Sequence, residues 1–183
     1  MTAETLLSDG IVSLRLMRDQ AADFAALSGW LSDPRVLEFY EGRDSPLSIE
    51  EATREFSPST MAAEANTPCF IEFEEVPIGY LQFYPAVEYG DRVWGLDQFI
   101  GVPELWGRGL GTRAVNLIKN YLFLEQHAAK CILDPQATNH RAIRCYEKAG
   151  FQKVRLLERH ELHEGEYRDC WLMEALPLTP DDA

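Results

Sequence analysis

The chain has 183 residues, 46% of them hydrophobic, which is enough for one domain with a substantial buried core. Its formal net charge is −13, which disfavours nucleic acid as a partner because phosphates repel acidic proteins. No stretch of eighteen apolar residues occurs, and the N-terminus lacks the basic and apolar regions of a signal peptide. We therefore expect residues 1–183 to form one cytoplasmic domain that does not enter a membrane, as a monomer or a homodimer.

The charge is unevenly distributed along the chain. Residues 105–155 contain nine Lys and Arg against three acids, whereas the rest contains eight against twenty-seven. The basic segment suits a ligand that carries phosphate, and the acidic remainder would attract a polycation by long-range steering. Solvated surface acid remains the simpler explanation for most of these carboxylates.

Cysteine and histidine give no sign of a metal site. The four cysteines are far apart in apolar segments and form no CxxC pair, so we expect buried free thiols at Cys69, Cys131, Cys145 and Cys170. His160 and His163 form an HxxH pair, but they lie in a charged, strand-like segment without the glutamate of a zinc protease. We expect both histidines to be exposed to solvent.

The N-terminal segments predict a strand followed by a helix. Residues 11–17 alternate apolar and polar side chains, as a half-buried strand does. Asp19 is a candidate N-cap for a helix that reaches about Leu31 and is stopped by Pro34. Further on, residues 36–42 form an irregular segment.

That irregular segment combines aromatic and acidic residues. Tyr40 and Glu41 are adjacent in it, beside Phe39. They would suit the lining of a pocket for a cation, and they would equally suit a segment whose aromatics fill the core. The residues alone leave both interpretations open.

The middle of the chain predicts a second helix and a hairpin. Ser48 and Glu51 have the spacing of a capping box, which begins a helix over residues 48–65 that is interrupted at the proline near its middle. Residues 68–73 and 78–84 then predict two strands joined by a short turn.

A glycine-rich segment follows the next predicted strand and begins a helix. It reads Leu105, Trp106, Gly107, Arg108, Gly109, Leu110, Gly111 and Thr112. Alternate glycines allow backbone N–H groups to turn inward, and the apolar positions after Leu110 recur with helical period. A helix N-terminus with unpaired amides and basic neighbours is a binding site for phosphate.

Three other interpretations compete for this segment: a P-loop, a dinucleotide-binding loop and a structural turn. A P-loop requires a lysine before Thr112, and none is present. The dinucleotide pattern GxGxxA fits residues 109–114, but too few residues follow for the remaining units of that fold. A tight structural turn before a core helix stays open.

The C-terminal half completes the predicted order of elements. Residues 94–102 form a strand that leads into the glycine segment, and residues 130–133 form a strand after its helix, in a parallel crossover. Residues 138–149 predict another helix, and residues 151–160 and 167–176 predict two closing antiparallel strands.

Two motifs together resemble the GNAT N-acetyltransferases. The family's acetyl-CoA loop, Arg/Gln-x-x-Gly-x-Gly/Ala, is matched at residues 108–111, although Trp106 stands where the family has Arg or Gln. The next helix of the family carries an Asn near its start and ends in YEKAGF, as found at Asn139 and residues 146–151. Residues 95–100 and 139–146 look most like the aminoglycoside 6′-N-acetyltransferases.

The resemblance implies a fold and an activity. The fold would be an α/β (α+β) GNAT fold, with a mixed sheet of about seven strands that splays at a bulge between the fourth and fifth, and about four helices. The activity would be direct acetyl transfer from acetyl-CoA, without a metal, to the 6′-amine of an aminoglycoside, which would give antibiotic resistance. Polyamines or protein N-termini are alternative acceptors, and a non-catalytic acyl-CoA sensor is the alternative to an enzyme.

The resemblance also implies roles for particular residues. Asp97, a lone charge in an apolar strand, would bind the acceptor ammonium and take its proton, or else form a structural salt bridge. Tyr146 would protonate the CoA thiolate, or else fill the core. The acetyl-CoA site would comprise Phe99, Ile100, Gly107, Arg108, Gly109, Leu110, Gly111, Thr112 and Asn139. The acceptor site would comprise Tyr40, Glu41, Asp97 and Asp134, together with Glu161 or Glu164 of the final hairpin.

Overall fold

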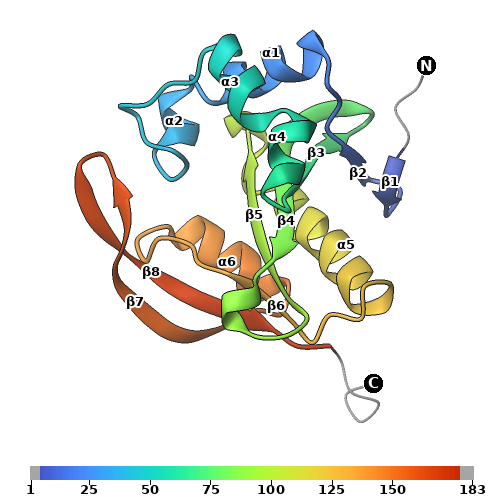
Figure 1. Ribbon diagram of the computed structural model, residues 1–183, viewed down its shortest axis with the longest axis vertical. Coiled ribbons are helices and arrows are strands. Elements are labelled where there is room, and N and C mark those ends of the chain that lie inside the picture. The colour runs from blue at the N-terminus through green and yellow to red at the C-terminus, as the bar shows by residue number, and fades with distance from the viewer. Residues whose placement is uncertain (1–4, 178–183) are drawn as a thin grey trace.

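The computed structural model describes residues 5–177. Eight strands form one mixed sheet in the order β1-β2-β3-β4-β5-β6-β8-β7 (Figure 1). Neighbouring strands are antiparallel except β5 and β6, which are parallel. The strands are β1 Thr5–Ser8, β2 Val12–Leu16, β3 Thr67–Phe73, β4 Val76–Pro85, β5 Val93–Ile100, β6 Lys130–Leu133, β7 Gln152–His163 and β8 Glu166–Ala175.

Six α-helices cover the two faces of this sheet. They are α1 Ala21–Trp30, α2 Pro34–Leu37, α3 Ile49–Phe56, α4 Pro58–Ala63, α5 Leu110–Leu124 and α6 His140–Lys148. The first four pack over one face and α5 and α6 over the other, so a large hydrophobic core forms on each face; a smaller cluster joins Ala86, Val93, Ile132 and Leu172. Alternation along β3 shows this division, because Cys69 and Ile71 enter the core under α5 while Phe70 enters the core under α1. No helix among residues 5–177 is long and apolar enough to cross a membrane.

The parallel pair β5 and β6 separates soon after it forms. Val93 pairs with Lys130, Trp94 with Cys131, and Gly95 with Ile132, and the pairing ends there. On its other side β5 stays paired with β4 as far as Ile100, in register throughout. The splay expected in this sheet is therefore present, but the expected bulge is not found within the described residues of β5 and β6. The edge of β5 after Gly95 is open to a ligand.

The long helix α5 begins beside this opening. Gly109 precedes it in the left-handed conformation, with φ 79°, which a glycine adopts without the strain of a Cβ. Gly109 has no side chain with which to cap the helix, so the first N–H groups of α5 remain available to an anion. On the side of α5 that faces the hydrophobic core, Ala114, Ile118 and Leu122 are buried.

Several predicted boundaries and counts differ from the structure. The sheet has eight strands rather than about seven because the short β1, which pairs with β2, was not predicted. The α-helices of residues 5–177 number six rather than about four, because the helical turn α2 begins before the irregular segment and extends into it, and the interrupted helix is two helices. Gln20, and not Asp19, is the N-cap of α1. The capping box of Ser48 and Glu51 is confirmed.

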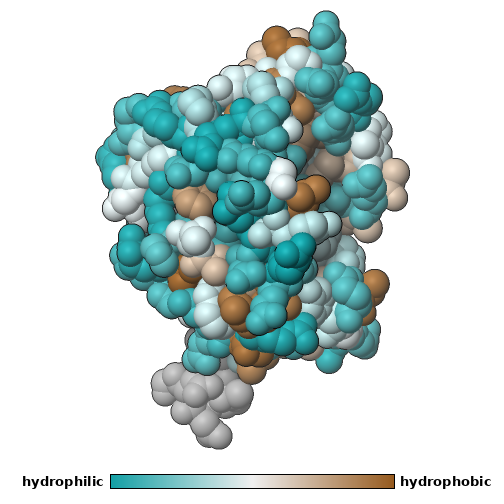
Figure 2. All heavy atoms as spheres, turned by 90° about the vertical axis from the view of Figure 1, so that its left-hand side faces the viewer, coloured by the Kyte–Doolittle hydropathy of each residue, from teal (hydrophilic) through white to brown (hydrophobic). Residues whose placement is uncertain are grey.

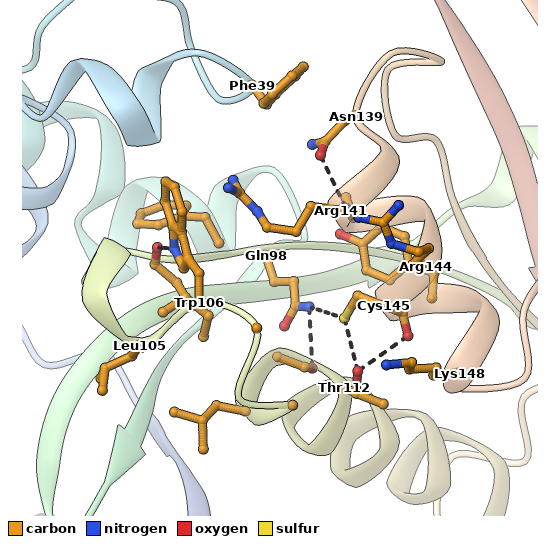
Figure 3. A pocket seen from close by; sticks show the side chains of 18 of the residues that line it. Phe39, Gln98, Leu105, Trp106, Thr112, Asn139, Arg141, Arg144, Cys145 and Lys148 are labelled. Carbon is orange, nitrogen blue, oxygen red and sulfur yellow. Dashed lines mark hydrogen bonds between the residues drawn. The ribbon is translucent and has the colours of Figure 1, made fainter.

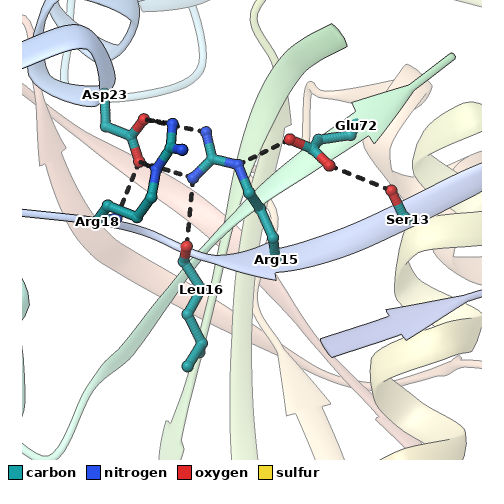
Figure 4. Close-up of polar contacts among 6 residues, drawn as sticks. All are labelled: Ser13, Arg15, Leu16, Arg18, Asp23 and Glu72. Atoms are coloured by element: carbon teal, nitrogen blue, oxygen red, sulfur yellow. Dashed lines mark hydrogen bonds and ion pairs between the residues drawn. The ribbon is translucent and has the colours of Figure 1, made fainter. Parts of the chain in front are cut away.

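A buried ion cluster joins the beginning of the sheet to α1 (Figure 4). Arg15 on β2 is only 1% exposed and donates to both carboxylate oxygens of Asp23, at 2.6 and 3.0 Å. Its Nε also donates to Glu72 on β3 at 2.7 Å, and its guanidinium lies over the ring of Phe70. Arg18 gives Asp23 a further ion pair at 2.7 Å. Asp23 is therefore the acceptor that keeps a buried guanidinium paired.

We predict that Asp23→Asn lowers the free energy of unfolding by about 3–5 kcal/mol, because it leaves Arg15 buried with an incomplete partner. Burial by itself would raise the pKa of Asp23, but hydrogen bonds from Arg18 and Arg15 outweigh it and lower that pKa. The stabilisation is thus present above the unfolded pKa and is lost as pH falls through the folded one. Urea unfolding should show the loss, with exposed Asp91→Asn as the unchanged control. Equal stability of the two variants would contradict the assignment.

Candidate active site

Two adjoining cavities lie where β5 and β6 separate. The first has a volume of about 220 Å³ and is bounded by the glycine segment, the end of β5 and α6 (Figure 3). The second has a volume of about 500 Å³ and is bounded by β5, the end of β6 and the β7–β8 hairpin. Six residues line both cavities: Phe39, Tyr40, Gln98, Asn139, Ala142 and Tyr146. Ligands in the two cavities would meet at this shared wall.

The first cavity has the character of an anion site. Three cations on one face of α6 line it, since Arg141, Arg144 and Lys148 are three and four residues apart. The N-terminus of α5 lies opposite them, and among residues 5–177 no Asp or Glu lines this cavity. Backbone amides and guanidinium groups together suit phosphate.

Most of the residues predicted for the acetyl-CoA site line this cavity. They are Phe99, Ile100, Gly107, Gly109, Leu110, Gly111, Thr112 and Asn139. Arg108 does not, because its guanidinium lies over the ring of Phe73 on β3, 5.3 Å from the centre. Asn139 is the N-cap of α6, and its side-chain oxygen accepts from the N–H of Ala142 at 3.1 Å. Its amide nitrogen takes no part in that cap.

The second cavity has the opposite charge. Four carboxylates line it, namely Glu41, Asp97, Asp134 and Glu161, and no Lys or Arg does so within the part of the chain that the structure describes. The side of the molecule that carries the β7–β8 hairpin is mostly hydrophilic, with apolar residues only in small separate patches (Figure 2). Several carboxylates around one hollow suit a ligand that carries several positive charges.

Tyr40 and Glu41 both line the second cavity, which answers the question left open for their segment. The ring of Tyr40 also packs on Phe99 with 4.6 Å between ring centres, so it serves as cavity wall and core together. Burial raises the pKa of Glu41, and the charges of Glu55 and Glu161 add to this effect. A cation placed in the cavity would relieve that repulsion.

Asp97 lies on β5 at the floor of the second cavity. It accepts a hydrogen bond from Gln82 on β4 at 3.0 Å, and the hydroxyl of Tyr80 holds the Gln82 amide in that orientation from 3.0 Å. Burial raises the pKa of Asp97 to about 6; the Gln82 bond opposes the rise, and Asp134, Glu161 and Glu41 add to it. No salt bridge to Asp97 is found among residues 5–177. A carboxylate with such a pKa can accept a proton near neutral pH.

The hairpin positions a further carboxylate in this cavity. Glu161 accepts a hydrogen bond from Gln136 at 3.1 Å, and the Nδ1 atom of His163 lies 3.1 Å from the same carboxylate. The Nε2 atom of His163 donates to the backbone oxygen of Glu38 at 3.0 Å, which ties the hairpin to the segment after α2. Glu164 instead pairs with Arg43 and does not line the cavity.

The expectation that both histidines are exposed is wrong for one of them. His163 is only 3% exposed, since it lies between the hairpin and the segment after α2. His160 is exposed as expected, and its Nε2 atom lies 2.8 Å from Asp134. The contact between hairpin and helix segment joins residues far apart in the chain, and local sequence pattern does not report it.

Tyr146 on α6 lies in the shared wall and is 7% exposed. Burial raises its pKa well above 10, and the charges of Cys145 and Asp97 act in the same direction. The phenol therefore stays protonated at neutral pH and is a potential donor. It lines both cavities.

Sequence reasoning missed Gln98 and the basic face of α6. Gln98 lines both cavities; its Nε2 donates to the Gly111 oxygen at 3.3 Å, and its buried Oε1 has no partner among residues 5–177. An amide in a strand of mixed composition gives no sequence signal. The spacing of Arg141, Arg144 and Lys148 on one helix face was a signal that could have been used.

The cysteines are free, as expected, and three of them are buried. Cys145 is less enclosed and lines the first cavity, where the Thr112 hydroxyl lies 3.3 Å from its sulfur. Burial raises the pKa of its thiol, which disfavours the nucleophilic thiolate. Over residues 5–177, no group of three His, Cys, Asp or Glu side chains is arranged to hold a metal ion.

This arrangement of loop, opened strands and helix agrees with a known family. A model described as an acetyltransferase (GNAT) domain matches residues 19–159. The chain belongs to the GNAT acetyltransferases. This GNAT protein has the mixed sheet and flanking helices expected from the two motifs.

Individual proteins of known sequence or structure are also similar to this chain. The aminoglycoside N(6′)-acetyltransferase type 1 of Klebsiella pneumoniae is 36% identical over 155 residues, which cover 80% of this chain and 76% of the relative. The solved structure of AAC(6′)-Ib in complex with ribostamycin and coenzyme A is similar with a TM-score of 0.81 and 31% identity, over 94% of this chain and 99% of that one. A Vibrio cholerae spermidine N-acetyltransferase in complex with CoA and spermine has a TM-score of 0.76 over 92% of this chain and 96% of that one, and its 20% identity shows the fold alone.

We predict that Asp97→Asn makes this GNAT protein more stable near neutral pH. The raised pKa means that the folded protein binds a proton that the unfolded chain, with its value near 3.8, has already lost. Stability therefore falls as pH rises from about 4 to about 6, by up to about 3 kcal/mol, and Asn removes this loss. Denaturant unfolding should show the variant more stable above about pH 6 and equal below about pH 4. A variant less stable at neutral pH would assign Asp97 a structural role instead.

Proposed function

We propose that this protein transfers the acetyl group of acetyl-CoA to the 6′-amine of aminoglycoside antibiotics, and thereby confers resistance to them. The observation that carries the proposal is a basic cavity and an acidic cavity that share one wall on β5 and α6. The first suits the phosphates of CoA, and the second suits a polycationic sugar. The names of the Klebsiella relative and of the AAC(6′)-Ib complex support this choice of substrates.

The glycine segment would bind acetyl-CoA. The amides at the N-terminus of α5 would meet the pyrophosphate, with Gly107 and Gly109 in positive-φ conformations that let the backbone approach. The edge of β5 at Phe99 and Ile100, which lies beyond the pairing with β6, would accompany the pantetheine arm, and a backbone amide there would polarise the thioester carbonyl. Asn139 would add a polar contact from α6.

The acceptor amine would attack the thioester directly. Asp97 would bind the 6′-ammonium and take its proton, which the pKa of about 6 permits near neutral pH. The neutral nitrogen then attacks the carbonyl carbon, the carbon–sulfur bond breaks as Tyr146 gives its proton to the departing thiolate, and the second proton, which the nitrogen loses as it becomes an amide, returns through solvent to the Tyr146 phenolate. No enzyme nucleophile is needed, which agrees with the raised pKa of the Cys145 thiol in the first cavity.

The remaining carboxylates would hold the rest of the sugar. Glu41, Asp134 and Glu161 approach the second cavity from three different segments, and the ring of Tyr40 lies between the cavities. Each exposed ion pair contributes about 1 kcal/mol or less, but a rigid polycation engages several at once with little ordering cost. Binding of the acceptor should therefore weaken as salt concentration rises.

Two alternatives remain and can be separated by assay. Another amine, such as a polyamine or a protein N-terminus, would use the same machinery, and the similarity to the spermidine enzyme extends only to the fold. A sensor that binds acyl-CoA without turnover would release no thiol with any amine. The single domain, the monomeric or dimeric state and the cytoplasmic location stay predictions from the sequence.

We predict that kanamycin- and tobramycin-like compounds with a 6′-amine are acetylated at that nitrogen, whereas analogues with a 6′-hydroxyl are not. Only an amine is both a charged ligand for Asp97 and a competent nucleophile once it loses a proton. Thiol release identifies the substrates in a panel that also contains polyamines and peptides, and mass spectrometry locates the acetyl group. Acetylation of the 6′-hydroxyl analogue at another nitrogen would refute the regiochemistry. Thiol release with no amine of the panel would favour a sensor.

A further inference from the structure

The first position of the acetyl-CoA loop motif holds a side chain that is not available to a phosphate. Trp106 occupies this position, where an Arg or Gln would present a polar side chain. The only polar atom of the indole, Nε1, donates to the backbone oxygen of Ile100 at 2.8 Å. The indole thus anchors the loop to the end of β5 and offers the first cavity only a flat apolar face.

That face holds an arginine from another element. The guanidinium of Arg141 lies 3.5 Å from the centre of the Trp106 ring, a distance typical of a close cation–π contact. The side chain extends from the beginning of α6 toward the loop, in the lining of the cavity (Figure 3). A planar guanidinium stacked on a planar ring has its N–H groups directed outward in one plane, which is the geometry for bidentate contact with phosphate.

The positive charge of Arg141 is available to a ligand. Partial desolvation lowers the pKa of Arg141, but a guanidinium stays charged at neutral pH. Among residues 5–177, Glu38 is the carboxylate whose charge acts on it, and that residue is exposed. Arg141 also remains accessible to solvent, so a ligand in the cavity can reach it.

We propose that Trp106 and Arg141 together replace the missing polar residue of the loop, with Trp106 fixing the guanidinium and Arg141 binding a phosphate group of CoA. The inference rests on the proposed binding of acetyl-CoA. It assigns two residues of separate elements to one contact: the tryptophan contributes orientation and the arginine contributes charge. Because the indole makes no phosphate contact of its own, its effect on CoA binding should depend on Arg141.

The test is calorimetric titration of CoA into the wild type, Arg141→Gln, Trp106→Leu and the double variant. Loss of a charge-assisted hydrogen bond should weaken CoA binding about 10- to 100-fold in Arg141→Gln. Trp106→Leu should weaken it less, and the double variant should bind no worse than Arg141→Gln, since the tryptophan acts through the arginine. Arg54→Gln, which changes an arginine on α3 outside both cavities, is the matched control and should bind CoA normally.

Two further measurements separate a phosphate contact from a folding defect. Acetyl-pantetheine carries the thioester without phosphates, so its turnover should be the same in Arg141→Gln and the wild type. Trp106→Arg introduced into Arg141→Gln should recover part of the CoA affinity by returning a cation to the loop. Wild-type CoA affinity in Arg141→Gln, or an equal loss with acetyl-pantetheine, would overturn the proposal. Failure of the wild type itself to bind CoA would overturn the proposed function as well.

Discussion

The loss of pairing between two parallel strands is the constraint on which the site depends. β5 and β6 share only three residue pairs, after which β6 ends and β5 continues to Ile100 against β4 alone. Among residues 5–177, the edge of β5 beyond Gly95 is thereby left without a partner strand, although the Trp106 indole donates to the Ile100 oxygen there. The N-terminus of α5 and the body of α6 border this gap, so cofactor loop, proton donor and acceptor pocket all meet at one break in the sheet.

The cavities on the two sides of that break are lined by side chains of opposite charge. Cations of α6 line one cavity and carboxylates from four segments line the other, in a protein whose net charge is −13. Burial and neighbouring carboxylates disfavour the ionised form of Asp97. A bound ammonium would lower the free energy of that form. The ion cluster around Arg15 and Asp23 lies elsewhere, between β2 and α1, and there opposite charges are matched at short distance. In the acidic cavity, by contrast, Asp97 has no Lys or Arg partner among residues 5–177.

Local signals predicted the elements that hold the site, and long-range contacts account for what was missed. Alternate glycines and helical periodicity predicted the loop and α5, and an isolated charge in an apolar strand singled out Asp97. β1 is four residues long and depends on β2 for its structure, so its own sequence is too short to indicate it. His163 is buried by a contact with Glu38, 125 residues away, and the stack of Arg141 on Trp106 joins two elements that no spacing relates. The roles of the site residues stay predictions.

The central claim is that Asp97 takes the proton of the acceptor while Tyr146 serves the leaving thiolate. The pH dependence of kcat/KM for a 6′-amino aminoglycoside, measured on the wild type, Asp97→Asn and Tyr146→Phe, tests it most directly. The account predicts a wild-type rate that falls as pH drops below about 6. Asp97→Asn should be slower by about 100-fold or more and lack this fall, whereas Tyr146→Phe should be slower and retain it. An acidic limb that persists in Asp97→Asn, with little loss of rate, would contradict the claim.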